Sequence, residues 1–288
     1  MEALIKAIKE EIKQNKARDK DIPLARKAYE DLSIHSRNVQ MDLTSSKLWP
    51  GKAFQASTIL RGTLEINGSI LLSVENGFFT AAESLLRVSI EHSINIIYIY
   101  SDTEISRSRS YLKHAILDME EKSRKHINRA KKANDKLDLF GANRNMEFAK
   151  QLKNENPKLV KDKDLKWRNA YERFKECGFE KEYRNLFSTA SDAVHSLSQD
   201  VLNRIFTFNM PPPLGKLNAE KVETYRKSLS IYFLLQALRI NSLAIIRVAE
   251  DIEYKDIYKI QHIHNTVFDC ILEHEMEFAE TQLTSVSI

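Results

Sequence analysis

The stretch LLRVSIEHSINIIYIY, Leu85 to Tyr100, decides the fold. In a helix built from it, apolar residues cover nearly the whole circumference, and such a helix normally lies at the centre of a protein. Arg87, Glu91 and Asn95 interrupt the stretch at helical spacing and therefore share one face. Because an unpaired buried charge is too costly, we expect this face to be paired inside the protein or to line a solvated cleft.

A second apolar segment, from about Ala53 to Glu75, precedes this stretch, and Asn76–Gly77 separates the two. So short a connection makes the two helices antiparallel neighbours. The chain has only 7 Gly and 6 Pro in 288 residues and no run of alternating strand pattern. The sequence therefore predicts an all-α fold, a multi-helix bundle built around a central antiparallel helical hairpin.

Helical periodicity and breakers divide the rest of the chain. The predicted helices cover Leu4–Ile12, Ile22–Gln40, Glu104–Lys132, a short helix within Ala133–Asp164, Leu165–Glu176, Glu180–Phe208, Ala219–Asp251 and Lys255–Thr281. We expect N-terminal helices in 1–50, a core with the polar site in 51–210 and a C-terminal helical hairpin in 211–288. Together they would form a single compact domain.

Charge is uneven along the chain. The net charge of the chain is +4, but the segment from Lys113 to Lys181 contains 19 Lys and Arg and only 12 Asp and Glu. A basic region of this size attracts phosphate groups, so RNA is a candidate partner, with Lys122, Arg124 and Lys125 as candidate contacts. The alternative is an ordinary solvated helix surface.

Cysteine usage and hydropathy indicate the compartment. The two cysteines, Cys177 and Cys270, form no CxxC spacing, which argues against a disulfide scaffold or a cysteine zinc site and fits a reducing cytoplasm. The N-terminus does not have the pattern of a signal peptide, and the longest apolar stretches are too short or interrupted for a membrane span. We expect a cytoplasmic protein that does not enter a membrane.

A late segment, Tyr183 to Ser196, is the candidate partner of the central helix. Ser188, Ser191 and His195 recur at intervals of three and four residues, so they share a face. Histidine is the side chain best suited to exchange a proton near neutral pH. We expect His195 to meet Arg87 and Glu91 in one polar cavity; the alternative is that Arg87 and Glu91 pair with each other and only lock the packing. His35, His126 and His274 have polar neighbours and are expected at the surface.

Two blocks of sequence carry a resemblance. AAESLLRVSIEHSINIIYI followed by SRSYLKHAI, and then WRNAYERFKECGFEKEYRNLFSTASDAVHS, resemble a bacterial all-helical family of unknown function with an LLRxxxE helix and a late YxxxYxxxSxxxH helix. The resemblance covers about Ala53 to Ile205 and departs at Phe187, where the pattern has tyrosine. It implies a helical fold and a site. The matching positions are Arg87, Glu91, Tyr111, His114, Trp167, Tyr183, Ser191 and His195.

The chain is also similar, more loosely, to the HEPN superfamily of helical bundles, many of which are metal-independent ribonucleases in phage defence and toxin–antitoxin systems. The similarity rests on Arg followed by His in RVSIEH (Arg87 to His92) and RSYLKH (Arg109 to His114). It implies that Arg stabilises a charged phosphate while His moves a proton, and that the site assembles in a homodimer. Of the two pairs, Arg109 and His114 lie beside the basic region.

No phosphate-binding loop, HExxH or nucleophile motif is present, so we expect neither a cofactor nor a bound metal. Two functions remain open. The first is a HEPN-like ribonuclease or toxin-type effector, with Arg87, Glu91, His195, Arg109 and His114 as catalytic candidates. Its candidate substrate-binding residues are Asn95, Tyr111, Tyr183, Ser191, Lys122, Arg124 and Lys125. The second is a non-enzymatic helical binding or regulatory module with a buried Arg/Glu/His cluster.

Overall fold

The computed structural model describes residues 2–45, 50–188 and 198–286, and within these ranges it contains helices, turns and loops but no strand. The predicted all-α fold is confirmed. Contacts divide the chain into two compact units: Met1–Tyr100 together with Arg173–Ile288, and Ser101–Glu172. The boundaries expected at residues 50 and 210 both fall inside the first unit.

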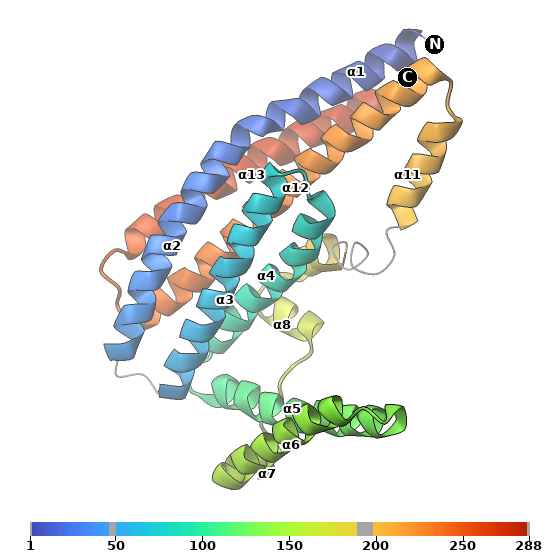
Figure 1. The fold of residues 1–288 in the computed structure, drawn as a ribbon. Coiled ribbons are helices and arrows are strands. Elements are labelled where there is room, and N and C mark those ends of the chain that lie inside the picture. Colours follow the sequence, from blue (N-terminus) through green and yellow to red (C-terminus); the bar gives the residue numbers. More distant parts are fainter. Residues whose placement is uncertain (1, 46–49, 189–197, 287–288) are drawn as a thin grey trace. The chain divides into compact units, whose positions relative to one another are not determined.

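The first unit is a bundle of long helices (Figure 1). Its elements are α1 (Glu2–Ala17), the 3-10 turn η1 (Arg18–Lys20), α2 (Asp21–Ser45), α3 (Pro50–Glu75), α4 (Phe79–Tyr100), α9 (Glu180–Glu182), the π-helical turn η2 (Tyr183–Phe187), α11 (Ser198–Asn209), α12 (Pro212–Asp251) and α13 (Ile257–Val286). Helix α8 (Ala170–Glu176) spans the boundary between the units.

The α3–α4 pair is the predicted antiparallel hairpin. Gly77 ends α3 with φ +76°, a left-handed conformation that side chains disfavour. The Phe78 amide donates to the Ser73 carbonyl at 2.8 Å, which satisfies an end group of the helix. The two helices then pack along their length. The Asn76–Gly77 signal therefore placed the turn correctly.

Helix α12 is the central element of the first unit. It packs against α1, α2, α3, α4, α11 and α13, and Figure 1 shows α12 and α13 running alongside α1 and α2. From Ser228 to Ala249 nearly every residue is buried. In the described part of the chain, only α12 has the length and hydropathy to cross a membrane. However, 78% of its most apolar window is buried inside the protein, as expected of a core helix.

Helix α12 begins earlier than predicted, within the proline cluster. The expected start was Ala219, but the helix begins at Pro212, with Pro211 as its N-cap residue. Proline is tolerated there because the first amides of a helix have no intrahelical partner to lose. The cluster therefore starts a helix as well as ending the previous one.

Of the predicted helix Glu180–Phe208, the structure describes α9, which passes into the π-helical turn η2, and α11, which begins at Ser198. Residues 189–197 of this prediction lie outside the described part of the chain. Helix α11 turns a polar side toward α12, where Asn218 donates to the Thr207 hydroxyl at 2.8 Å. Its apolar residues are exposed instead: Val201, Leu202, Ile205, Phe206 and Phe208.

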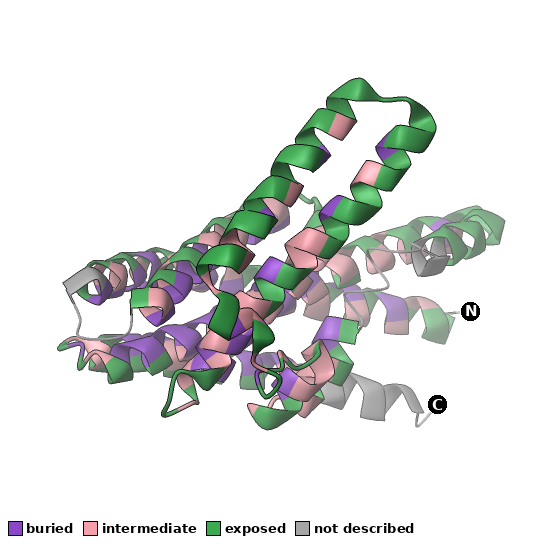
Figure 2. Cartoon of the chain, turned by 90° about the horizontal axis from the view of Figure 1, so that it is seen from below, coloured by how far each residue is buried: buried purple, intermediate pink, exposed green. Residues whose placement is uncertain are grey.

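The second unit is a helical hairpin with a small core. Its elements are α5 (Ser106–Ala133), α6 (Lys136–Glu155) and α7 (Pro157–Lys161). Ile116, Leu159 and Leu165 form the buried cluster, and most other positions along the hairpin are exposed (Figure 2). Helix α6 is much longer than the short helix predicted, because Asp135 caps it and its amphipathic face packs on α5.

His274 on α13 is buried, so its predicted surface position is wrong. Its Nε2 lies 3.2 Å from the Ser228 hydroxyl of α12, and its ring lies against Tyr232. Burial, and secondarily the charge of Arg18, lowers the pKa of His274 to about 4. The imidazole is therefore a neutral core group at physiological pH.

Truncating the centre of α12 should be costly. Leu234 has no exposed surface, and we expect Leu234→Ala to lower the free energy of unfolding by about 2–5 kcal/mol through lost burial and a residual cavity. The control is Leu72→Ala on α3, whose side chain is 59% exposed and which should cost less than about 0.5 kcal/mol. Urea denaturation measures both. Equal losses would contradict the central position of α12.

The buried histidine should make stability depend on pH. The unfolded chain binds a proton on His274 below pH about 6.5, whereas the folded chain does so only near pH 4. Stability is therefore lost as pH falls through this window. When the pH is lowered from 7 to 5, we expect the free energy of unfolding to fall by about 2 kcal/mol less in His274→Gln than in the unmodified protein. If urea denaturation gives the same change in the free energy of unfolding with pH for both proteins, this prediction is wrong.

Candidate functional site

The charged residues of α4 do not pair with each other. Glu91 instead accepts a hydrogen bond from Nη2 of Arg173 on α8, at 2.8 Å. The Arg87 guanidinium lies over the ring of Phe187 on η2, with its carbon 4.6 Å from the ring centre. The polar face of α4 thus meets residues that follow the second unit in the chain. The alternative of a mutual Arg87–Glu91 pair is not what the structure contains.

An aromatic cluster supports the Arg87 side chain. The rings of Phe174, Tyr183 and Phe187 lie 5.2–5.3 Å apart, centre to centre, in each pairing. Phe174 is completely buried and Phe187 nearly so. Tyr183 and Phe187 begin and end the π-helical turn, a local widening that is common at functional sites. Phe187, where the family pattern has tyrosine, thus provides a ring face for a cation and needs no hydroxyl.

The Glu91–Arg173 pair joins α4 to α8. The Arg173 side chain is only 6% exposed, whereas that of Glu91 is 35% exposed. Removing the carboxylate would leave a buried positive charge with its main counter-charge missing, which is strongly unfavourable. Arg173 was not among the predicted site residues. The sequence gives little indication that Arg173 belongs to the site, because the ERFKE segment has the composition of an ordinary amphipathic helix.

Arg87 keeps hydrogen-bonding capacity that no described residue uses. Its side chain is half-buried, and within the described residues it makes no hydrogen bond or ion pair beyond its stacking on Phe187. A guanidinium has five N–H donors in a planar fork that matches carboxylate and phosphate groups. Stacking holds the plane of this fork, and no described residue forms a hydrogen bond with its edge; such a group can bind an anion.

The neighbouring polar residues of α4 face the interior. Asn95, a predicted substrate-binding residue, is 9% exposed, and its side-chain oxygen has no hydrogen-bond partner among the described residues. Nδ1 of His92 is likewise buried. Burial is the main cause of the lowered pKa of His92, so this imidazole is neutral near pH 7. Asn95 is thus more buried than Arg87 and Glu91, whereas His92 is half-buried like them.

Two predicted residues, Ser191 and His195, lie outside the described residues. They follow Phe187 in the sequence by four and eight residues. The expected meeting of His195 with Arg87 and Glu91 therefore stays a prediction. Tyr183, by contrast, takes part in the aromatic cluster beneath Arg87.

The Arg109/His114 pair belongs to the second unit. Arg109 Nη2 is 3.7 Å from a carboxylate oxygen of Asp162, and Lys113 donates to the Asp162 carbonyl. His114 is exposed. Tyr111 packs edge-on against Trp167, with ring centres 5.0 Å apart. The charge of Arg109 is thus partly balanced by Asp162, whereas Arg87 has no ion pair with a described residue.

The predicted basic contacts lie on the exposed surface of α5. Lys122 pairs with Asp118 at 2.7 Å and Lys125 with Glu121 at 2.6 Å, each one turn away. Arg124 is exposed. These local pairs offset part of the positive charge, and exposed pairs of this kind contribute little stability. The surface is available to a polyanion but is not a shaped site.

We expect the Glu91–Arg173 pair to couple strongly in a double-mutant cycle. Glu91→Gln should cost about 1–3 kcal/mol, because it leaves the Arg173 charge buried, and much less in the Arg173→Met background. The control cycle uses Arg61 and Glu65 on α3, an exposed pair at 3.9 Å, with an expected coupling below about 0.5 kcal/mol. Urea denaturation gives all the free energies. Coupling no larger than in the control would show that the pair does not hold α4 to α8.

The comparisons with known proteins give one match. The sequence profile of a family of unknown function, DUF5677, matches residues 55–210, more than half of the chain. No curated protein and no solved structure matches at a significant level. The matched range includes α4, the Arg87–Phe187 contact and the Glu91–Arg173 pair. The chain belongs to the family of unknown function DUF5677.

Proposed function

We propose that the protein is a metal-independent ribonuclease of the HEPN type, acting on RNA at the Arg87 site. One observation carries the proposal: a half-buried guanidinium is fixed on an aromatic ring and has no counter-ion among the described residues. A partly desolvated positive charge destabilises the folded protein unless a negatively charged group or a hydrogen-bond acceptor compensates it. The phosphodiester of RNA is an anion that a guanidinium fork fits well.

The chemistry needs two kinds of group. In cleavage by transesterification, the ribose 2′ oxygen forms a bond to phosphorus and the bond from phosphorus to the 5′ oxygen breaks. A base removes the proton from the 2′ hydroxyl, and the conjugate acid so formed gives a proton to the departing 5′ oxygen. Positive charge on the non-bridging oxygens stabilises the transition state, and Arg87 would supply it. No metal ion takes part in this sequence of steps.

We assign both proton transfers to His195, whose neutral imidazole takes the 2′ proton and whose imidazolium then gives a proton to the 5′ oxygen. His92, the histidine of the RVSIEH pair, is disfavoured because its Nδ1 is buried and its pKa is lowered by burial. His195 lies eight residues after Phe187 in the sequence and fits the late helix pattern of the family. Glu91 would orient the site through Arg173, as a positioning residue. In this proposal the protein acts in the cytoplasm, and the basic 113–181 region attracts the RNA backbone.

A second function rests on the same contacts. The Arg87–Phe187 and Glu91–Arg173 interactions also suit a purely structural role, in which they fix the packing of α4 in a non-enzymatic binding module. The two functions differ in what Arg87→Met changes. A structural role requires a large loss of stability, whereas a catalytic role requires a loss of activity in a folded protein.

The decisive experiment measures RNA cleavage in the presence of EDTA. We expect Arg87→Met and His195→Gln each to lower the cleavage rate by about 100-fold or more, the range seen when a charge-stabilising donor or a general acid–base group is removed. Arg61→Met, which removes an exposed arginine of α3, is the matched control, and Arg109→Ala and His114→Ala test the second pair.

Melting temperatures of the same variants separate the two functions. A folded Arg87→Met protein without cleavage activity supports the ribonuclease. Absence of cleavage by the unmodified protein, or equal cleavage by Arg87→Met, would reject it. If Arg87→Met melts far lower and no RNA is cleaved, the contacts belong to a structural cluster.

A further inference from the structure

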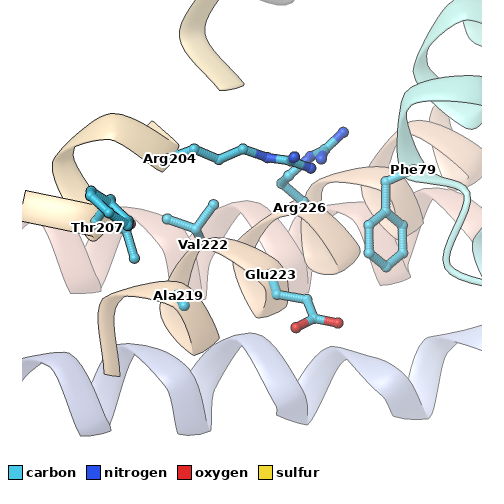
Figure 3. Close-up of a pocket in the computed structure, with 8 residues that line it drawn as sticks. Phe79, Arg204, Thr207, Ala219, Val222, Glu223 and Arg226 are labelled. Carbon is cyan, nitrogen blue, oxygen red and sulfur yellow. The ribbon is translucent and has the colours of Figure 1, made fainter. Parts of the chain in front are cut away.

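A cavity lies at the start of α12, between that helix, α11 and the first residue of α4. Its volume is about 410 Å³, within the range of small-molecule sites. The lining residues are Phe79, Arg204, Thr207, Phe208, Ala219, Val222, Glu223 and Arg226 (Figure 3). None of them belongs to the Arg87 site.

The wall formed by α11 is held in place at its C-terminal end. Gly215 lies so close to this end that a Cβ atom added to it would be 2.9 Å from the Thr207 carbonyl oxygen. The Asn218 amide donates to the Thr207 hydroxyl at 2.8 Å. Because the turn after α11 fixes this spacing, the polar side of α11 stays opposite the first turns of α12.

Two arginines direct positive charge into the cavity. In Figure 3 the side chain of Arg204 extends from α11 toward that of Arg226 on α12, while the Glu223 carboxylate points away from both. Arg226 donates to the Thr80 hydroxyl at 2.6 Å, which places its guanidinium at the N-terminal end of α4, where the helix dipole is positive. Arg204 makes no hydrogen bond or ion pair with any described residue. An anion bound in the cavity would offset the repulsion between these two positive charges.

Apart from Thr207 and Glu223, the rest of the wall is apolar. Phe79 and Val222 lie in the cavity beside the two arginines, and Phe208, 90% exposed, forms its edge. A polyphosphate would leave this surface uncovered, and one carboxylate against two guanidiniums leaves a surplus of a single positive charge. The lining therefore matches a ligand with one acidic group and an apolar body.

We propose that this cavity binds a small organic acid, a carboxylate or phosphate attached to an aromatic or aliphatic body. The acidic group lies between Arg204 and Arg226, and the body packs on Phe79 and Val222. The proposal is independent of ribonuclease activity, since it uses none of the residues assigned to that reaction.

The test uses the fluorescent sulfonate 1-anilinonaphthalene-8-sulfonate as the probe on the full-length chain. We expect phenyl phosphate and 4-phenylbutyrate to displace it, and which of the two binds tighter identifies the acidic group. Neutral 4-phenylbutanol and inorganic phosphate, each lacking half of the ligand, should displace it poorly. Arg204→Met and Arg226→Met should each weaken binding by about tenfold or more.

Three further variants make the result specific. Val222→Trp should fill the cavity and weaken binding without changing the charge. If Arg226→Met fails to fold, Val222→Trp and Arg204→Met, which alters an exposed residue, still test the proposal. Arg61→Met on α3 should bind as the unmodified protein does. Phe206→Gln alters the exposed apolar side of α11, where the probe could bind non-specifically, and should also leave binding unchanged.

Four results would overturn the proposal. The first is unchanged binding by Arg204→Met. The second and third are displacement by 4-phenylbutanol that is as effective as by 4-phenylbutyrate, and displacement by inorganic phosphate that is as effective as by phenyl phosphate. The fourth is loss of probe binding in Phe206→Gln but not in the arginine variants.

Discussion

The first unit depends on the burial of the second half of α12. Between Ser228 and Ala249 this helix is apolar on nearly all sides, so its neighbours must surround it to remove that surface from water. Helices α1, α2, α3, α4 and α13 all pack against it. Burying a large aliphatic side chain contributes about 1.5–3 kcal/mol, and many such side chains line this helix. The positions of the surrounding helices follow from this one requirement.

The same requirement explains why α4 carries charge on a single side. Packing against α3 and α12 covers most of its circumference, and the side that is left receives α8 and η2. Glu91 and Arg87 each find a group there, an arginine for the carboxylate and an aromatic ring for the guanidinium. The carboxylate is paired with Arg173, whereas no described residue accepts a hydrogen bond from the Arg87 guanidinium. This asymmetry distinguishes the site from an ordinary buried ion pair.

Much of this fold could be predicted from the sequence, because periodicity and turn residues are local signals. The α3–α4 hairpin follows from Asn76–Gly77 and two apolar helices. The length of α6 was underestimated because only a narrow apolar stripe faces α5. His274 was misplaced because its neighbours Glu273 and Glu275 are acidic, although the His274 side chain itself is buried against α12. Arg173 was missed because pairing across 82 residues has no local signature. The site's face could be located, but its partners are set by tertiary packing.

The order of the helices along the chain has a consequence for synthesis. Helices α1 to α4 leave the ribosome first, the separate Ser101–Glu172 unit follows, and α12 comes only after it. Until α12 emerges, the sides of α1 to α4 that pack on it have no cover. Nascent chains of this protein should therefore expose apolar surface while residues 101–211 are being synthesised, and depend on chaperones during that interval.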